Sequence, residues 1–208
     1  MQKTAENIDK LLSQLESCKT TLLNSLLGMM QADNRALYTN DLLLSAVGNR
    51  AISLIDGFLL LAKSDNYLCA LPLIRLQLDN SLRFYATSLV EDSNDFFNHF
   101  ASGEPIRNYR SKDGKKLSDN YLATQLELKI PGIKDIYRKT SSYIHLSDQH
   151  LRAIIKKCHQ SGNNTIGIGA NTNFSDSEKR HITKTMLDVT YIANIIINGW
   201  RAIKDRNE

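Results

Sequence analysis

Apolar residues recur along most of the chain at steps of three and four, which is the spacing of one face of an α-helix. The pattern is clearest near the N-terminus, where it runs through Ile8, Leu11, Leu12, Leu15, Leu22, Leu23, Leu26 and Leu27. It predicts helices over about residues 5–30, 41–64, 67–90, 119–128, 133–146 and 175–205, with a short helix over 92–101. Such long periodic segments are typical of a helical bundle.

The helical pattern is interrupted before the last helix. Residues 150–157 and 165–168 flank a turn-forming Ser-Gly-Asn-Asn segment, which predicts a small β-hairpin. Ser175 and Glu178 then form the capping-box pattern that starts a helix. The sequence therefore predicts an all-α fold, a bundle of five to six helices with a small β-hairpin insertion before the C-terminal helix.

The composition favours one globular domain over the whole range 1–208. The chain is 42% hydrophobic and 23% charged, and no low-complexity or Pro-rich linker divides it. Its first residues are charged throughout, unlike a secretory signal. The most apolar stretch, 42–62, is interrupted by Arg50 and Asp56, so we expect a cytoplasmic protein without a membrane span.

The cysteines give no sign of a metal site. Cys18, Cys69 and Cys158 are far apart, and none has a second Cys or His at the short spacing that structural zinc requires. We therefore expect reduced thiols, no bound metal and no cofactor.

Positive charge is concentrated in the middle of the chain. Residues 104–160 contain twelve Lys and Arg against six Asp and Glu. The densest part carries Arg107, Tyr109, Arg110, Lys112, Lys115 and Lys116. Basic side chains neutralise phosphates and a tyrosine ring can stack on a base, so this segment is a candidate RNA-binding surface. The alternative is a solvated, mobile loop that is soluble because it is charged.

A second charged pattern lies on the predicted helix 67–90. Arg75, Asp79 and Arg83 follow each other at four-residue steps, the spacing at which side chains on a helix form ion pairs. Because the flanking residues are apolar, we interpret this pattern as a structural ladder of ion pairs rather than as part of an active cleft.

The segment Tyr-Arg-Lys-Thr-Ser-Ser-Tyr-Ile-His, residues 137–145, holds the candidate catalytic pair. Arg138 and His145 are seven residues apart. On a continuous helix that spacing returns to within about 20° of the same face, about 10 Å further along the axis. If the helix runs through both residues, their side chains can enter one cleft.

This segment, preceded by Leu-Ile-Arg-Leu-Gln-Leu-Asp-Asn at 73–80, resembles the HEPN superfamily of prokaryotic toxin and defence proteins. The resemblance implies a metal-independent endoribonuclease of a toxin or phage-defence system, with its site completed across a homodimer. Arg138 would hold the scissile phosphate, and His145 would exchange a proton with the 2′-hydroxyl or the leaving oxygen. An antitoxin or another protein would be a further partner.

The resemblance also leaves a second function open, because many HEPN-like proteins serve as binding or dimerisation modules. In that case the chain is a non-catalytic interaction module, and His145 hydrogen-bonds the end of its own helix. The sequence therefore offers two hypotheses, a ribonuclease and an interaction domain.

Overall fold

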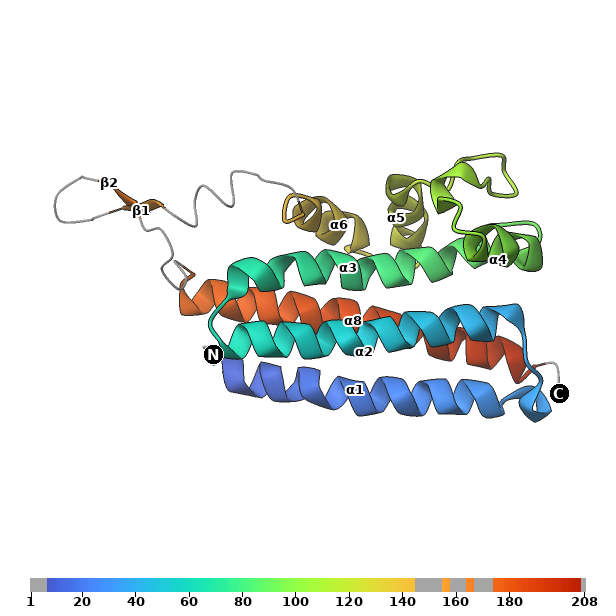
Figure 1. Ribbon diagram of the computed structural model, residues 1–208, viewed down its shortest axis with the longest axis horizontal. Helices are drawn as coiled ribbons and strands as arrows, with labels where there is room; N and C mark the ends of the chain where they lie inside the picture. Colours follow the sequence, from blue (N-terminus) through green and yellow to red (C-terminus); the bar gives the residue numbers. More distant parts are fainter. Residues whose placement is uncertain (1–6, 145–154, 158–163, 167–173, 207–208) are drawn as a thin grey trace.

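Four long helices form a bundle in the computed structural model, which describes residues 7–144, 155–157, 164–166 and 174–206. They are α1 (Ile8–Gln31), α2 (Thr39–Lys63), α3 (Tyr67–Tyr85) and α8 (Asp176–Lys204). Figure 1 shows that α1, α3 and α8 run in one direction and α2 in the other. The predicted all-α fold is confirmed.

Three shorter helices lie along the outer side of α3 (Figure 1). They are α4 (Ser93–Ala101), α5 (Asp119–Glu127) and α6 (Ile133–Ser141). The short 3-10 helices η1 (Asp33–Arg35), η2 (Ala86–Ser88) and η3 (Ile106–Asn108) connect the longer elements. α5 and α6 contact each other and both contact α3. α3 is therefore packed between the long bundle and the α5–α6 pair.

The described part of the chain contains seven α-helices, so the predicted count of five to six was low. The short helix predicted over 92–101 is confirmed as α4, where Asp92 accepts hydrogen bonds from the backbone N–H groups of Asn94 and Asp95 and caps the helix. The capping box at Ser175 and Glu178 is confirmed at the start of α8.

The last predicted helix before the hairpin is shorter than expected. α6 ends at Ser141, five residues before the predicted end at Leu146. Three consecutive hydroxyl side chains, those of Thr140, Ser141 and Ser142, donate hydrogen bonds to backbone carbonyls of the preceding turn. Such bonds compete with the helical pattern, and the chain continues as a turn.

Two short strands precede α8. β1 (Ile155–Lys157) pairs antiparallel with β2 (Asn164–Ile166), and Lys156 lies opposite Thr165. Residues 158–163, which join them, lie outside the described residues, as do 145–154 and 167–173. The complete hairpin insertion therefore stays a prediction.

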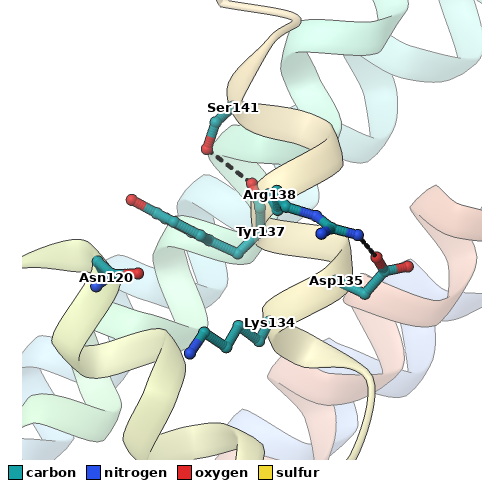
Figure 2. Close-up of a pocket in the computed structure, with 6 residues that line it drawn as sticks. All are labelled: Asn120, Lys134, Asp135, Tyr137, Arg138 and Ser141. Carbon is teal, nitrogen blue, oxygen red and sulfur yellow. Dashed lines mark hydrogen bonds and ion pairs between the residues drawn. The ribbon is translucent and has the colours of Figure 1, made fainter.

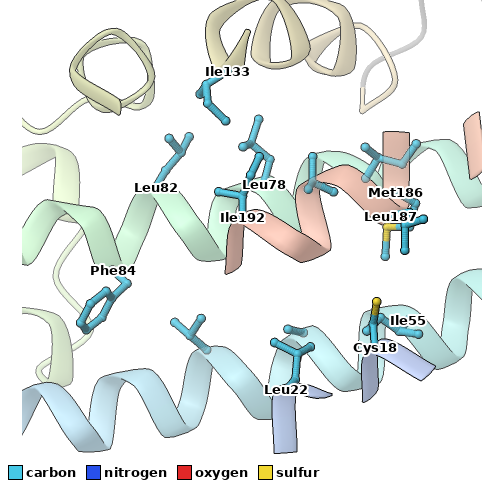
Figure 3. Close-up of a cluster of buried hydrophobic side chains, with 14 of the residues drawn as sticks. Cys18, Leu22, Ile55, Leu78, Leu82, Phe84, Ile133, Met186, Leu187 and Ile192 are labelled. Carbon is cyan, nitrogen blue, oxygen red and sulfur yellow. The ribbon is translucent and has the colours of Figure 1, made fainter. Parts of the chain in front are cut away.

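The hydrophobic core lies between the four long helices. Figure 3 shows Leu22 of α1, Ile55 of α2 and Met186 of α8 converging on it. On the outer side of α3, the buried side chain of Ile133 joins α6 to the same cluster. α2 has the length and composition of a membrane span, with a mean hydropathy of 1.4, and 44% of that stretch is buried inside the bundle.

One buried ion pair fastens the end of α8 to the turn between α1 and α2. The Lys204 side chain is fully buried, and its ammonium donates to Asp41 Oδ2 at 2.9 Å and to the carbonyls of Met29 and Ala36 at 3.0 and 2.9 Å. Asp41 also accepts hydrogen bonds from the Trp200 indole at 2.7 Å and the Tyr38 backbone at 2.9 Å. Every polar atom of this pair thus has a partner.

Replacing Lys204 by Met should destabilise the protein by about 3–5 kcal/mol, because the Asp41 carboxylate would stay buried without its counter-charge. Urea unfolding followed by helical circular dichroism measures the change. Arg206→Met, at an exposed position two residues further on, is the control and should change stability by less than about 0.5 kcal/mol. An equal effect of the two substitutions would contradict this role for Lys204.

Candidate nucleic-acid interface

The first residue of α5 is clamped by two arginines of α3. Arg75 Nη2 lies 2.9 Å from Asp119 Oδ2, and Arg83 Nη2 lies 2.7 Å from Asp119 Oδ1. Asp79 sits between the arginines, 3.1 Å from Arg83 and 3.8 Å from Arg75. The predicted ladder of ion pairs is confirmed, and Asp119 extends it from α3 to α5.

Arg75 also holds α6 in place. Its side chain is only 6% exposed, and its guanidinium lies over the Tyr137 ring, 4.7 Å from the ring centroid. A guanidinium at this distance is attracted to the face of an aromatic ring. The same arginine therefore positions both α5, through Asp119, and α6, through Tyr137.

The start of α6 is fixed by a carboxylate from α5. Glu127 accepts hydrogen bonds from the backbone N–H groups of Gly132, at 3.0 Å, and Lys134, at 2.8 Å. These two donors, Gly132 first, lower the pKa of the Glu127 carboxyl. Gly132 has a φ of 97°, a left-handed conformation that glycine adopts readily. The α5–α6 connection is therefore a defined turn.

Two adjoining cavities open beside this turn. One has a volume of about 550 Å³ and the other about 400 Å³, and Asn120 and Tyr137 line both. The larger cavity is also lined by Lys134, Asp135, Arg138 and Ser141. The smaller one is also lined by Arg83, Pro105, Ile106, Arg107, Ser118 and Asp119. Together they form a groove, which we call the α5–α6 groove.

The α5–α6 groove is lined by four cations, Arg83, Arg107, Lys134 and Arg138, and by two carboxylates. Arg107 and Lys134 form no ion pair within the part of the chain that the structure describes. Figure 2 shows Lys134 and Tyr137 extending toward α5, which carries Asn120. The groove thus combines positive charge with an aromatic ring and an amide.

Arg138 lies at the rim of the groove. Its side chain is 80% exposed, and Nη2 is 2.8 Å from Asp135 Oδ1. Figure 2 shows the guanidinium turned toward this carboxylate. Asp135 also binds Lys139 at 2.7 Å, and the hydrogen bonds from Lys139 and then Arg138 lower the pKa of its carboxyl.

His145, the second residue of the candidate catalytic pair, lies outside the described residues. The expected geometry requires a helix that runs through both Arg138 and His145. α6 ends at Ser141, so the same-face argument does not extend to residue 145. Joint action of the two residues stays a prediction.

The basic segment forms a turn with its own backbone hydrogen bonds. Arg110 and Lys116 form an antiparallel bridge, and the Ser111 backbone N–H donates to the Lys115 carbonyl at 2.8 Å. Its five basic side chains, those of Arg107, Arg110, Lys112, Lys115 and Lys116, belong to exposed residues. Arg107, at the start of the segment, and Ser118, two residues after its end, line the α5–α6 groove.

Tyr109, the predicted stacking residue of the basic segment, packs against α4. Its ring packs edge-on against Phe96, with centroids 5.3 Å apart, and against His99 at 5.1 Å. Its hydroxyl donates to Asp95 Oδ2 at 2.6 Å. This hydrogen bond, with desolvation second, raises the pKa of Tyr109 to about 12. Tyr109 anchors the basic segment to α4.

No cluster of three metal-binding side chains occurs among the described residues. Of the cysteines, Cys18 is buried and free, Cys69 is exposed and free, and Cys158 lies outside the described residues. Burial raises the pKa of the Cys18 thiol.

Among the groove residues that sequence reasoning missed are Asp119, Asn120 and Lys134. Each is an ordinary polar residue on a short helix, and no local pattern distinguishes it. Only the docking of α5 and α6 on α3 brings them together with Arg83 and Arg107.

No protein-family profile, curated protein or solved structure matches this chain. The resemblance to the HEPN superfamily therefore depends on the segments 73–80 and 137–145 alone.

Tyr109→Phe should lower stability by about 1 kcal/mol at neutral pH, because the hydrogen bond to Asp95 is lost. The contribution of Tyr109 is fully present below its unfolded pKa of 10 and is lost as the pH rises through the folded value of about 12. Between these values the wild type should lose stability more steeply than the variant. Parallel pH profiles in urea unfolding would contradict the Asp95 contact.

Proposed function

We propose that this protein binds RNA in the α5–α6 groove and is a HEPN-like, metal-independent endoribonuclease of a toxin or phage-defence system. The observation that carries the proposal is the convergence of Arg83, Arg107, Lys134 and Arg138 on one groove from α3, η3 and α6. Phosphates supply most of the affinity between nucleic acids and proteins, and they are bound by such clusters of cations.

The neighbouring basic turn adds to this charge. Since Arg107 lines the groove, an RNA strand in the groove meets the positive field of Lys112, Lys115 and Lys116 at one end. Tyr137 is the aromatic residue of the groove itself: its ring lines both cavities, with the Arg75 guanidinium over one face. Stacking on such a ring contributes about 1–3 kcal/mol per base.

Arg138 is available to a scissile phosphate although it pairs with Asp135. Their ion pair is solvent-exposed, and exposed pairs contribute about 0–1 kcal/mol. A bidentate contact of the guanidinium with a phosphate is stronger than such a pair. RNA binding would therefore draw Arg138 away, while Asp135 keeps its second partner, Lys139.

Cleavage at this site would require no metal. The 2′-oxygen attacks the adjacent phosphorus as its proton leaves, the bond from phosphorus to the 5′-oxygen breaks, and that oxygen takes up a proton. The products are a 2′,3′-cyclic phosphate and a 5′-hydroxyl. His145 would exchange one of these protons, and Arg138 would neutralise the charge on the phosphate.

A second function, a non-catalytic interaction or dimerisation module, is favoured by a different observation. Arg138 is held by Asp135 and turned away from Asn120 and Lys134, as expected of a surface ion pair (Figure 2). Under this proposal the groove binds RNA or a protein partner such as an antitoxin without cleaving it. The protein would then act in the cytoplasm as a homodimer or a complex.

RNA affinity should fall steeply with added salt if the groove and the basic turn contact phosphates. Each contact with single-stranded RNA contributes about 0.7 to the slope of log affinity against log salt. Arg107→Gln with Lys134→Gln should therefore reduce the slope by about 1.4, and Lys112→Gln with Lys115→Gln should reduce it similarly. Fluorescence anisotropy of a labelled RNA oligonucleotide measures both slopes.

The control for these charge changes is Lys63→Gln, an exposed lysine at the end of α2. It should leave the slope unchanged. No binding at low salt, or equal slopes for all variants, would remove RNA from the proposal.

Cleavage of a mixed RNA pool in EDTA tests the catalytic step. His145→Ala should reduce the rate by about 10²–10⁴, the usual contribution of a general acid or base. Arg138→Lys keeps the charge but loses the planar fork, so it should also lower the rate sharply. If a homodimer shares the site, a mixture of the two variants should recover part of the activity.

The same assay separates the two proposed functions. If the groove binds RNA but the protein does not cleave it in EDTA, and His145→Ala does not change the RNA affinity, the protein is an interaction module. Cleavage that survives both substitutions would remove Arg138 and His145 from the mechanism.

A further inference from the structure

Asn120 and Tyr137 mark the junction between the two cavities of the α5–α6 groove. Of the described residues, these two line both cavities. Lys134 and Arg138 line the larger cavity alone, and Arg107 lines the smaller one alone. A nucleotide whose flanking phosphates contact cations in both cavities therefore has its base at the junction.

The Tyr137 ring can stack on a base with one face. Its other face is taken by the Arg75 guanidinium, which lies 4.7 Å from the ring centroid. A base that stacks on the ring lies parallel to it. Figure 2 shows the ring extending from α6 toward α5, where Asn120 lies. The edge of a stacked base thus comes next to the Asn120 side chain.

The Asn120 side chain offers a donor and an acceptor next to each other. It belongs to an exposed residue in the first turn of α5. Its backbone carbonyl accepts a hydrogen bond from the Thr124 hydroxyl at 2.8 Å, but its side-chain amide has no hydrogen-bond partner among the described residues. An asparagine amide has one carbonyl oxygen and two N–H donors, so it can form a pair of hydrogen bonds with one base.

The other polar side chains of the groove do not offer such a pair. The Ser118 hydroxyl caps α5, and the Ser141 hydroxyl donates to a backbone carbonyl of its own helix at 2.7 Å. Asp119 and Asp135 each bind two cations. Lysine and arginine side chains are donors only, and they suit phosphates.

We propose that Asn120 selects adenine at this junction. Its carbonyl oxygen would accept a hydrogen bond from the N6 amino group of the base, and its N–H group would donate to the N7 atom, while the base stacks on Tyr137. Adenine has this donor and acceptor side by side, whereas guanine has two acceptors at the same edge and the pyrimidines lack N7. The inference rests on the RNA binding proposed above and gives it a substrate class, single strands rich in adenine.

Three labelled decamers test the inference by fluorescence anisotropy with the full chain. One is oligoadenylate, the second contains 7-deazaadenosine, which lacks the N7 acceptor, and the third contains purine riboside, which lacks the N6 amino group. A homopolymer places the same base at the junction in every register. The wild type should bind each analogue about tenfold more weakly than oligoadenylate, the effect of one hydrogen bond.

Four variants assign the preference to one side chain. Asn120→Ala should bind the three decamers with equal affinity. Asn120→Asp keeps the acceptor and loses the donor, so it should still discriminate against purine riboside but no longer against 7-deazaadenosine. Tyr137→Phe keeps the ring and should keep the full preference. Asn24→Ala, an exposed asparagine on α1, is the matched control and should behave as the wild type.

The inference is overturned if the wild type binds either analogue as tightly as oligoadenylate. It is also overturned if Asn120→Ala keeps the preference or if Tyr137→Phe loses it. In each of these cases, salt-dependent binding of all decamers would leave the RNA proposal standing. If no decamer binds at low salt, both proposals fail. Helical circular dichroism verifies that each variant folds, and Asn120→Asp decides if Asn120→Ala does not.

Discussion

The placement of the functional surface depends on one ion-pair network, in which Arg75 and Arg83 of α3 hold Asp119 of α5. Arg75 is almost completely buried, so its charge requires the carboxylate beside it. Because Tyr137 packs on the same guanidinium, α6 is held together with α5. The α5–α6 groove exists only where these two short helices are docked on α3.

The same network explains how a groove with excess positive charge is stable. Asp79 and Asp119 form ion pairs with Arg75 and Arg83 of α3. The positive charge of these two arginines is therefore largely neutralised within the protein. Arg107 and Lys134, on separate segments, line the groove without an ion pair in the described regions. Arg75 and Arg83 thus form ion pairs within the protein, whereas the nearby Arg107 and Lys134 are available to a ligand.

Two chemically different hollows adjoin α3. Outward from its surface, charged side chains and an amide line an open groove suited to phosphates. At its C-terminal end, Phe84 and Tyr85 line a small, mostly apolar cavity. The buried pair of Lys204 and Asp41 lies behind this second cavity and holds Trp200 through its indole.

The sequence by itself determined the all-α fold, because apolar residues at helical spacing must face a common core. It also identified the ion-pair ladder of Arg75, Asp79 and Arg83, because residues four apart are neighbours on any helix. It also located the basic segment. The local sequence pattern did not reveal that the hydroxyls of Thr140, Ser141 and Ser142 end α6 before residue 145. Nor did it reveal that Tyr109 binds Asp95 and so attaches the basic segment to α4. Only the tertiary structure decided which charges share a groove, since Arg83, Arg107 and Lys134 come from segments that meet solely through the docking of α5 and α6 on α3.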